Sequence, residues 1–164
     1  MKKVAIIMGS DSDLPIVEKC TKMLDELGVP YEAHVFSAHR SPDETMNFAR
    51  KAEEKGFGVL IGVAGMAAHL AGSLAANTCL PVIGIPCKSA ALEGLDALLS
   101  TVMMPSGIPV ATVAIDGGKN AAILAAQIIS LTDDALMARL KAQREDGHKA
   151  NLEKNRKVEE KLNK

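Results

Sequence analysis

Five strand-like runs, separated by segments with helical periodicity, restrict the fold of this chain more than any other feature. Residues 4–8 and 58–64 are apolar without alternation, which is typical of central strands covered on both faces. Three further strands are expected over residues 31–36, 81–85 and 110–115. Strands that alternate with helices predict a parallel sheet with helices on both faces and right-handed crossovers.

Helix signals fill the intervening segments. Apolar residues recur at helical spacing between residues 14 and 27, with a cap expected from Ser12 or Asp13 and a stop at Gly28. Further helices are expected over residues 42–55, 70–77, 94–101, 119–131 and 134–144. The 119–131 helix is apolar on nearly every side, which predicts burial within the domain or between subunits. The charged segment after Gly147 is expected to be a solvated helix or a frayed end.

These elements predict one α/β domain over residues 1–164, a length that suits a single domain. We expect a three-layer, flavodoxin-like five-stranded parallel sheet in the order 2-1-3-4-5, with a C-terminal helical extension. In that order the loops after the first three strands meet at the carboxyl edge of the sheet, where open α/β sheets bind ligands. These loops, residues 9–13, 37–40 and 65–69, are the richest in polar side chains.

The first two loops have groups that suit a phosphoribosyl ligand. Gly9-Ser10, before a helix, offers amides and hydroxyls that favour phosphate, and Ser37 and Arg40 add a hydroxyl and a planar cation. Asp13 is unsuited to phosphate but suits a pair of ribose hydroxyls. Residues 9–13 form neither a GxGxxG fingerprint nor a Walker loop, so a plain helix cap explains that loop equally well.

His39 lies in the loop before the helix that is expected to begin at Pro42. Ser41 and Glu44 have the spacing of a capping box, in which each side chain accepts from the other residue's amide. A histidine can take and give a proton near neutral pH, which makes His39 a candidate acid and base. The alternative is a polar loop that contains a histidine by chance.

Other kinds of site find less support in the sequence. The chain has no GxSxG elbow for a nucleophilic serine. His39 and His69 lack carboxylate or cysteine partners at metal-ligand spacing. His69 either belongs to the site or bonds the backbone of its own loop.

Composition bounds the partners and the location. A net charge of −1 without a basic stripe argues against nucleic acid, and no apolar run reaches the ~20 residues of a membrane span. The first strand begins so early that no signal peptide is expected, and three cysteines without CxxC spacing predict free thiols in a reducing compartment. We therefore expect a cytoplasmic protein. Of the residues, 48% are hydrophobic but only 2% are aromatic, so the core is built from small side chains that fill little volume. We therefore expect the protein to bury further apolar surface by self-association.

Several motifs together resemble one known family. Gly9-Ser10-Asp11-Ser12-Asp13, Ser37-Ala38-His39-Arg40-Ser41-Pro42 and Ala64-Gly65-Met66-Ala67-Ala68-His69-Leu70 resemble the three signature loops of the N5-carboxyaminoimidazole ribonucleotide mutases of purine biosynthesis. Residues 103–110 and 120–128 are also similar to that family. The likeness runs from about Val4 to Leu131.

The resemblance implies a flavodoxin-like subunit in a homo-octamer, with each active site at a subunit junction. It implies a small ribonucleotide substrate and no metal, nucleotide or organic cofactor, and it allows a transient contact with the synthetase that makes the labile substrate. In the family's reaction a carboxylate moves from the exocyclic nitrogen to the ring carbon. The carbamate first loses CO2, which stays trapped until the ring carbon attacks it.

The resemblance also implies roles for individual residues. His39 matches the histidine that shuttles the proton. Ser10, Ser37 and Arg40 match positions around the phosphate, and Asp13 matches the ribose ligand. Backbone at Ala38 and at Gly65, Met66 and Ala67 is expected to hold the carboxylate or CO2, and the expected substrate-binding set also includes Ser12, His69 and Leu70.

The third loop departs from the family pattern at two positions. Met66 stands where the family usually has a second glycine, and Ala71 stands where it usually has proline. We expect the Met66 side chain to point away from the pocket.

Two other readings stay open. The first is the related class that adds free CO2 to aminoimidazole ribonucleotide, which more often has lysine where Arg40 stands and a different third loop. The second is a non-catalytic phosphoribosyl-binding or signalling domain of flavodoxin-like fold. Receiver domains have a phosphorylatable aspartate at the end of the third strand, where this chain has Ala64 and Gly65.

Overall fold

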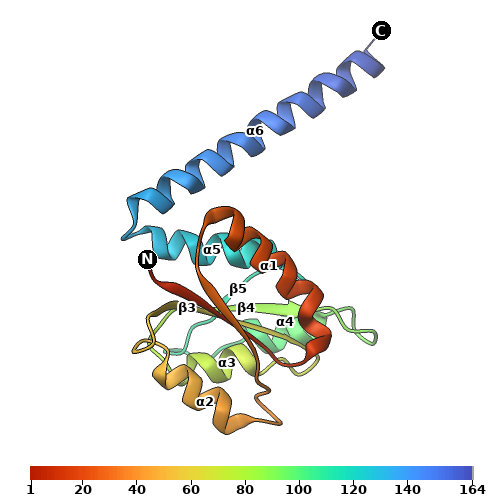
Figure 1. Ribbon diagram of the computed structural model, residues 1–164. Coiled ribbons are helices and arrows are strands. Elements are labelled where there is room, and N and C mark those ends of the chain that lie inside the picture. Colours follow the sequence, from red (N-terminus) through yellow and green to blue (C-terminus); the bar gives the residue numbers. More distant parts are fainter. Residues whose placement is uncertain (164) are drawn as a thin grey trace.

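The strands form a single parallel sheet in the order β2-β1-β3-β4-β5, which confirms the predicted order. The computed structural model describes residues 1–163 and is shown in Figure 1. β1 lies between β2 and β3, where Ile6 pairs with Ala33 on one side and Ile61 on the other. The strands are β1 (Lys3–Met8), β2 (Tyr31–Val35), β3 (Phe57–Gly65), β4 (Val82–Cys87) and β5 (Ala111–Thr112).

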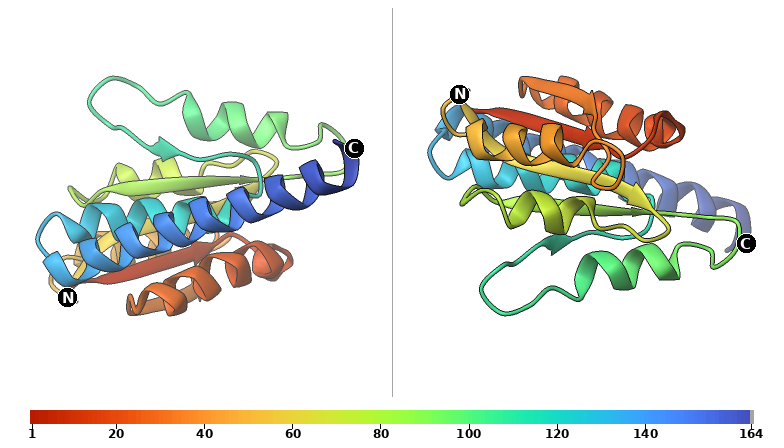
Figure 2. Two further views of the ribbon diagram at one scale, coloured as in Figure 1. Left: turned by 90° about the horizontal axis from the view of Figure 1, so that it is seen from above. Right: turned by 90° about the horizontal axis from the view of Figure 1, so that it is seen from below.

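Helices cover both faces of this sheet (Figures 1 and 2). The first face packs against α1 (Leu14–Leu27) and α5 (Gly118–Ser130). The second face packs against α2 (Pro42–Lys51) and α3 (Leu70–Ala75), and α4 (Leu95–Val102) lies on the same side over β4. Alternate residues of β1 enter the two cores, with Ile6 facing α1 and Ile7 facing α2 and α3. A strand buried on both sides explains why the sequence shows no alternation.

Small residues bring helices close to their neighbours. A Cβ on Gly62 of β3 would lie 2.8 Å from the Ala71 Cα of α3, and a Cβ on Gly118 of α5 would lie 2.4 Å from the Ile16 carbonyl oxygen of α1. α5 itself is only half-buried, because its alanines face the core while Ile123, Leu124 and Ile128 keep partial exposure. The predicted burial of this helix therefore holds for one side within the single chain.

Two predicted boundaries differ from the structure. β5 pairs with β4 only through Ala111 and Thr112, whereas a strand over residues 110–115 was expected. Strand β5 is at the edge of the sheet, so it has one neighbour to specify its length. α2 ends at Lys51 and not near residue 55, because the chain leaves the helix through a turn closed by Gly56, which has a φ of 83°.

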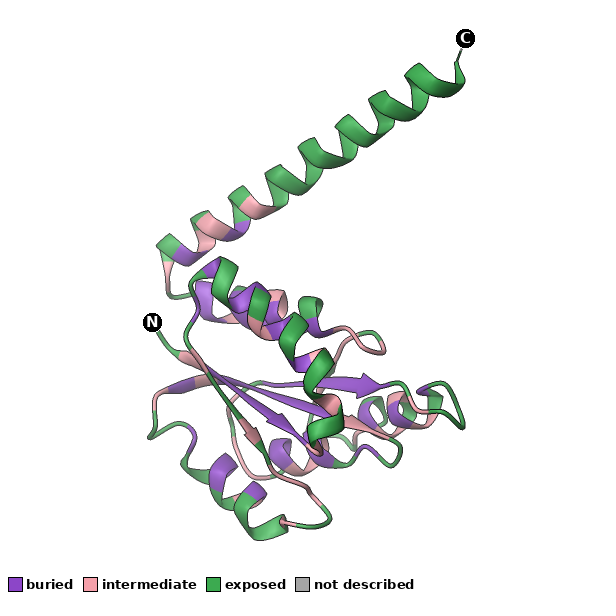
Figure 3. Ribbon diagram, turned by 45° about the vertical axis from the view of Figure 1, so that its right-hand side comes forward, coloured by how far each residue is buried: buried purple, intermediate pink, exposed green. Residues whose placement is uncertain are grey.

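The C-terminal segment is one long helix, α6 (Asp134–Leu162), which projects from the domain (Figures 1 and 3). The expected break near residue 144 is absent within this helix. Leu136 and Leu140 are buried against the domain, and beyond them the described residues are mostly exposed, so the expectation of a solvated helix is confirmed. Charged pairs one turn apart support it, including Arg156 with Glu153 at 2.8 Å. No helix within residues 1–163 is both long and apolar enough to cross a membrane.

Candidate functional site

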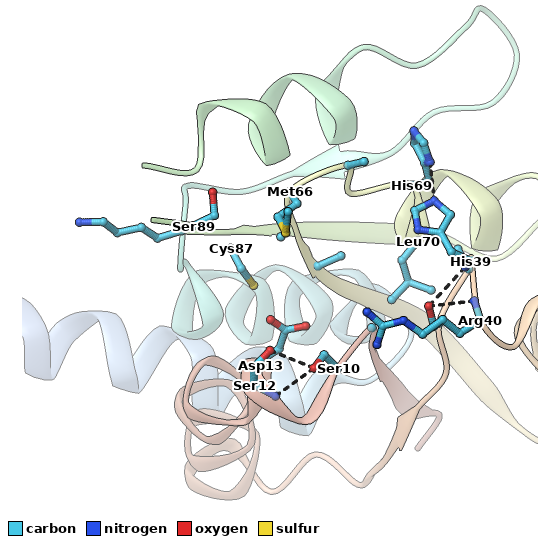
Figure 4. A pocket seen from close by; sticks show the side chains of 17 residues that line it. Ser10, Ser12, Asp13, His39, Arg40, Met66, His69, Leu70, Cys87 and Ser89 are labelled. Atoms are coloured by element: carbon cyan, nitrogen blue, oxygen red, sulfur yellow. Dashed lines mark hydrogen bonds between the residues drawn. The ribbon is translucent and has the colours of Figure 1, made fainter. Parts of the chain in front are cut away.

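The three predicted loops converge on one cavity of about 440 Å³ at the carboxyl edge of the sheet (Figure 4). The strand order explains this, because β1 lies between β2 and β3 and their C-terminal ends are adjacent. All twelve candidate residues predicted from the sequence line the cavity: Ser10, Ser12, Asp13, Ser37, Ala38, His39, Arg40, Gly65, Met66, Ala67, His69 and Leu70.

The first loop leaves β1 through a short 3-10 helix, η1 (Asp11–Asp13), that runs directly into α1. Ser10 caps it, because its Oγ accepts from the Ser12 backbone N–H at 3.3 Å and lies 3.0 Å from the Ser12 Oγ. Asp13, one of the two predicted caps, occupies the N-cap position of α1. Asp13 makes no capping bond to α1, which leaves its carboxylate available to the cavity.

Asp13 is a cavity carboxylate whose pKa is perturbed. Burial raises its pKa above the ordinary aspartate value, and bonds from the Ser10 backbone N–H and the Cys87 thiol oppose that rise. The nearby carboxylates of Asp11 and Asp116 raise the pKa of Asp13 further. A half-buried carboxylate beside two like charges is costly to the folded protein, which is typical of a group kept for binding.

We expect Asp13→Asn to raise the free energy of unfolding at neutral pH. The pKa of Asp13 is higher in the folded than in the unfolded protein, so ionisation of Asp13 lowers the free energy of unfolding. This loss develops as pH rises from the unfolded-state pKa to the folded-state pKa, and it persists at higher pH. The gain in the variant should therefore disappear below the unfolded aspartate pKa of ~3.9. Urea titrations from pH 3.5 to 8 measure it, with Asp146→Asn, at an exposed carboxylate on α6, as the control. An equal gain in both variants contradicts the assignment.

The second loop is held by two serine hydroxyls. The Ser37 Oγ accepts from the backbone N–H groups of His39 at 3.3 Å and Arg40 at 3.2 Å. The Ser41 Oγ accepts from the Ser37 N–H at 2.8 Å. α2 begins at Pro42 as predicted, but the capping box is wrong, because Ser41 uses its hydroxyl within the loop and makes no side-chain bond to the helix.

Arg40 offers a free cation to the cavity. Its backbone is fixed by Ser37, and its guanidinium extends toward the side of the cavity where Ser10 lies (Figure 4). Within residues 1–163 no carboxylate lies within ion-pair distance of it. An unpaired guanidinium beside several hydroxyls can bind an anion such as phosphate through two N–H groups.

The third loop brings a second histidine to the first. The His69 Nδ1 lies 2.8 Å from the His39 Nε2, with the rings at 87° to one another. One nitrogen donates and the other accepts, so the two rings share a single hydrogen. His69 precedes α3 and its backbone N–H donates to Ala67 O at 2.8 Å. Its imidazole therefore contacts the candidate acid and base directly, beyond a role within its own loop.

Met66 adopts a left-handed conformation with a φ of 54°. Glycine takes this conformation without steric cost, which gives a physical reason for glycine at this place in the family pattern. The residue is 67% exposed and lines the cavity, so the expectation that its side chain would avoid the pocket is not supported.

A fourth segment at the C-terminal end of β4 also lines the cavity and was not predicted from the sequence: Cys87, Lys88 and Ser89. The available signal was the strand order, which puts the end of β4 beside the end of β3. The Lys88 N–H donates to the Asp116 Oδ1 at 2.9 Å, and burial raises the pKa of the Cys87 thiol to about 12. Cys87 is thus a neutral thiol, and it is free, as are Cys20 and Cys79.

The cavity therefore has two chemically different parts. One part presents the hydroxyls, Asp13 and Arg40, and it suits the phosphate and ribose of a nucleotide. The other part presents the histidine pair beside small or apolar groups of the third loop, and it suits proton transfer to and from a bound ligand. In the part of the chain that the structure describes, no three metal-ligating side chains are grouped so as to hold an ion.

The chain is similar to known proteins along most of its length. Residues 3–150 match the family model of AIR carboxylase. The N5-carboxyaminoimidazole ribonucleotide mutase of Pyrococcus abyssi is 58% identical over 146 residues, which cover 89% of this chain and 84% of the relative. The mutase of Bacillus subtilis is 51% identical over 152 residues, covering 92% and 94%. The crystal structure of Treponema denticola PurE matches with a TM-score of 0.81 and 31% identity over 98% of both chains.

Proposed function

The chain belongs to the AIR carboxylase family and has the isomerase role in purine biosynthesis of its mutase relatives, and we propose that His39 carries the proton in that reaction. The reaction converts N5-carboxyaminoimidazole ribonucleotide into 4-carboxyaminoimidazole ribonucleotide. The observation that carries the proposal is the contact of His39 with His69 in a cavity that also contains a free arginine and serine hydroxyls.

The proton transfers balance around one histidine. Protonated His39 donates its proton to the carbamate nitrogen. The bond between that nitrogen and the carboxylate carbon then breaks, CO2 leaves, and the two bonding electrons stay on the nitrogen. The ring carbon then attacks CO2, and neutral His39 removes the proton displaced from that carbon. One proton is given and one is recovered, so the enzyme returns to its starting state. His69 orients the His39 ring through the 2.8 Å contact.

The remaining lining groups fit the other parts of the substrate. Arg40 and the hydroxyls of Ser10 and Ser37 form the proposed phosphate site, because they face one part of the cavity without a carboxylate paired to the guanidinium. Asp13 accepts from the ribose hydroxyls. This placement orients the aminoimidazole ring toward His39 and the third loop.

We further propose that the protein assembles, in the cytoplasm, into a homo-octamer whose active sites lie at subunit junctions. The support is a line of exposed apolar side chains along α4 and its ends, the α4 stripe: Leu92, Leu95, Leu99, Val102 and Met103. Each is at least 45% exposed, and a continuous apolar patch of this kind marks an interaction surface. The segment that leads into α4 lines the cavity, so a neighbouring subunit bound to the α4 stripe would lie near the site.

We also propose a transient contact with the synthetase that supplies the labile substrate.

Leu99→Glu is expected to dissociate the assembly. The side chain is 51% exposed at the middle of the α4 stripe, and a buried unpaired carboxylate opposes association. Sedimentation velocity should show a shift from the octamer toward smaller species. Leu14→Glu on α1, across the sheet, is the control for the added charge. A monomeric wild-type protein, or an unchanged mass in the Leu99 variant, contradicts the role of the α4 stripe.

The test of the reaction is conversion of N5-carboxyaminoimidazole ribonucleotide to the 4-carboxy product, followed by absorbance without bicarbonate, metal or nucleotide. Rapid conversion supports the proposal. Conversion of aminoimidazole ribonucleotide with bicarbonate, but not of the carbamate, would assign the CO2-dependent class instead. Inactivity toward both substrates would contradict either reaction.

A further inference from the structure

Cys87 is a buried thiol at the C-terminal end of β4, where the strand meets the cavity. The residue is only 4% exposed, yet it lines the cavity beside the third loop, because its backbone pairs with Gly65 at the end of β3. Its sulfur points toward the carboxylate of Asp13 (Figure 4). A buried cysteine ordinarily serves as a small apolar residue. Here the thiol is directed at a group with a proposed role in binding.

Asp116 fixes the backbone on both sides of Cys87. The Asp116 N–H donates to the Pro86 carbonyl at 2.9 Å, and the Asp116 Oδ1 accepts from the Lys88 N–H at 2.9 Å. Asp116 makes these bonds in a left-handed conformation, with a φ of 57°, which is unfavourable for a residue with a Cβ. Such a conformation persists only where the surrounding structure over-determines it. The position of the Cys87 side chain is therefore set by the bonds on either side of it.

The Cys87 thiol has one hydrogen and two acceptors within reach. The Ile85 carbonyl oxygen lies 3.9 Å from Sγ, which is long even for sulfur, and the other acceptor is the Asp13 carboxylate. Hydrogen bonds to an ionised acceptor are stronger than those between neutral groups, so the carboxylate is the better partner. Burial, assisted by nearby carboxylates, raises the pKa of the thiol to about 12, so the hydrogen stays on sulfur at neutral pH.

Asp13 receives donors from two separate elements. It is half-buried and lies near the carboxylates of Asp11 and Asp116, so its own carboxylate is subject to like-charge repulsion. The Ser10 N–H donates to it from the first loop, and the Cys87 thiol donates from β4. Donors on different elements fix the orientation of a carboxylate better than one donor can. An ionised carboxylate has about four acceptor positions, so two remain for the hydroxyls of a ribose.

We propose that Cys87 is a positioning residue for substrate binding: its thiol donates to the Asp13 carboxylate and holds it toward the ribose hydroxyls. This inference rests on the proposed function, in which Asp13 accepts from those hydroxyls. Cys87 acts through Asp13, so its effect on affinity should require the Asp13 carboxylate. A double-mutant cycle measures that dependence directly.

The experiment measures the affinity of aminoimidazole ribonucleotide by calorimetry, without chemistry. Wild type is compared with Cys87→Ala, with Asp13→Ala and with the variant that carries both changes. Cys87→Ser is the conservative variant, because its hydroxyl replaces the thiol as a donor. Cys20→Ala is the matched control, because Cys20 is a buried thiol of the same core cluster and does not line the cavity.

We expect Cys87→Ala to weaken binding by about three- to tenfold, the contribution of one hydrogen bond. Cys87→Ser and Cys20→Ala should bind within about twofold of wild type, the range of independent substitutions. In the Asp13→Ala background, Cys87→Ala should have almost no further effect, because the carboxylate that the thiol positions is absent.

Three results would overturn the inference and leave the proposed role of Asp13 intact. The first is a Cys87→Ala variant that binds as wild type does, while Asp13→Ala binds more weakly. The second is an additive loss in the double variant, since Cys87 would then act without Asp13. The third is a Cys87→Ser variant as weak as Cys87→Ala, since the donated hydrogen would be irrelevant.

Unchanged affinity in Asp13→Ala would have a different meaning. It would contradict the ribose site of the proposed function, and the inference about Cys87 would fail with it. The affinity of the Asp13 variant alone therefore distinguishes failure of the proposed function from failure of the inference.

Discussion

Replacing His39 with asparagine is expected to lower turnover by about 10²–10⁴-fold, the contribution of a positioned acid and base. Asparagine retains a polar group of similar size, but it cannot accept and return a proton near neutral pH. The backbone of residue 39 is held by the Ser37 Oγ, which accepts its N–H at 3.3 Å, so the loop should keep its conformation. Substrate affinity should change little, because the proposed phosphate and ribose groups remain.

The measurement separates kcat from substrate affinity. Single-turnover absorbance gives the chemical step, and calorimetric binding of aminoimidazole ribonucleotide gives affinity without chemistry. His148→Asn is the matched control, because His148 is an exposed residue on α6 and does not line the cavity. Near-normal turnover in the His39 variant would refute the proton transfer. If weaker substrate binding accounted for the whole loss of activity, His39 would be a binding residue only.

The architecture was predictable because its signals are local and repeated. The apolar runs at residues 4–8 and 58–64 marked the central strands, and the strand order alone brought His39, Asp13 and Met66 to one edge of the sheet. Gly28 marked the end of α1 through its left-handed conformation, with a φ of 63°. In such cases local pattern and tertiary packing favour the same structure.

The errors arose where a polar side chain had several possible partners. The sequence around Ser41 fits a capping box, but in the structure its hydroxyl bonds the Ser37 N–H at 2.8 Å. At the start of α1, Asp13 takes the N-cap position without a capping bond, and Ser10 makes its capping bond to η1. Short-range spacing shows which bonds are available, whereas the choice among them depends on how the loop is anchored at both ends.

The contact between His39 and His69 was also beyond the sequence. The residues are 30 positions apart, and their 2.8 Å contact joins the loops that follow β2 and β3. The segment at Cys87 was missed because its residues carry no motif and its place in the site follows only from β4 lying beside β3. Side-chain geometry of this kind is decided by packing between elements.

Gly62→Ala is expected to destabilise the protein by about 1–3 kcal/mol and to lower activity as well. Its Cβ would lie 2.8 Å from the Ala71 Cα, 3.0 Å from the Ala71 Cβ and 3.1 Å from the Ala71 N. These are mainly backbone contacts in α3, so no side-chain rotation relieves them and the helix must move away from β3. α3 directly follows His69, so the same movement should disturb the 2.8 Å contact with His39.

The activity of Gly62→Ala should fall by about a hundredfold, the effect of a displacement near 1 Å at a reacting centre. Urea denaturation measures the loss of stability, and the absorbance assay measures turnover in the folded fraction. Gly65→Ala is the control for stability, because it lies on the same strand and its Cβ would meet only Cys87 atoms at 3.5 Å or more. If Gly62→Ala were destabilised but fully active, α3 would accommodate the methyl group without moving His69. The close approach of β3 and α3 would then support the fold alone, and the position of His69 would depend on its loop bonds.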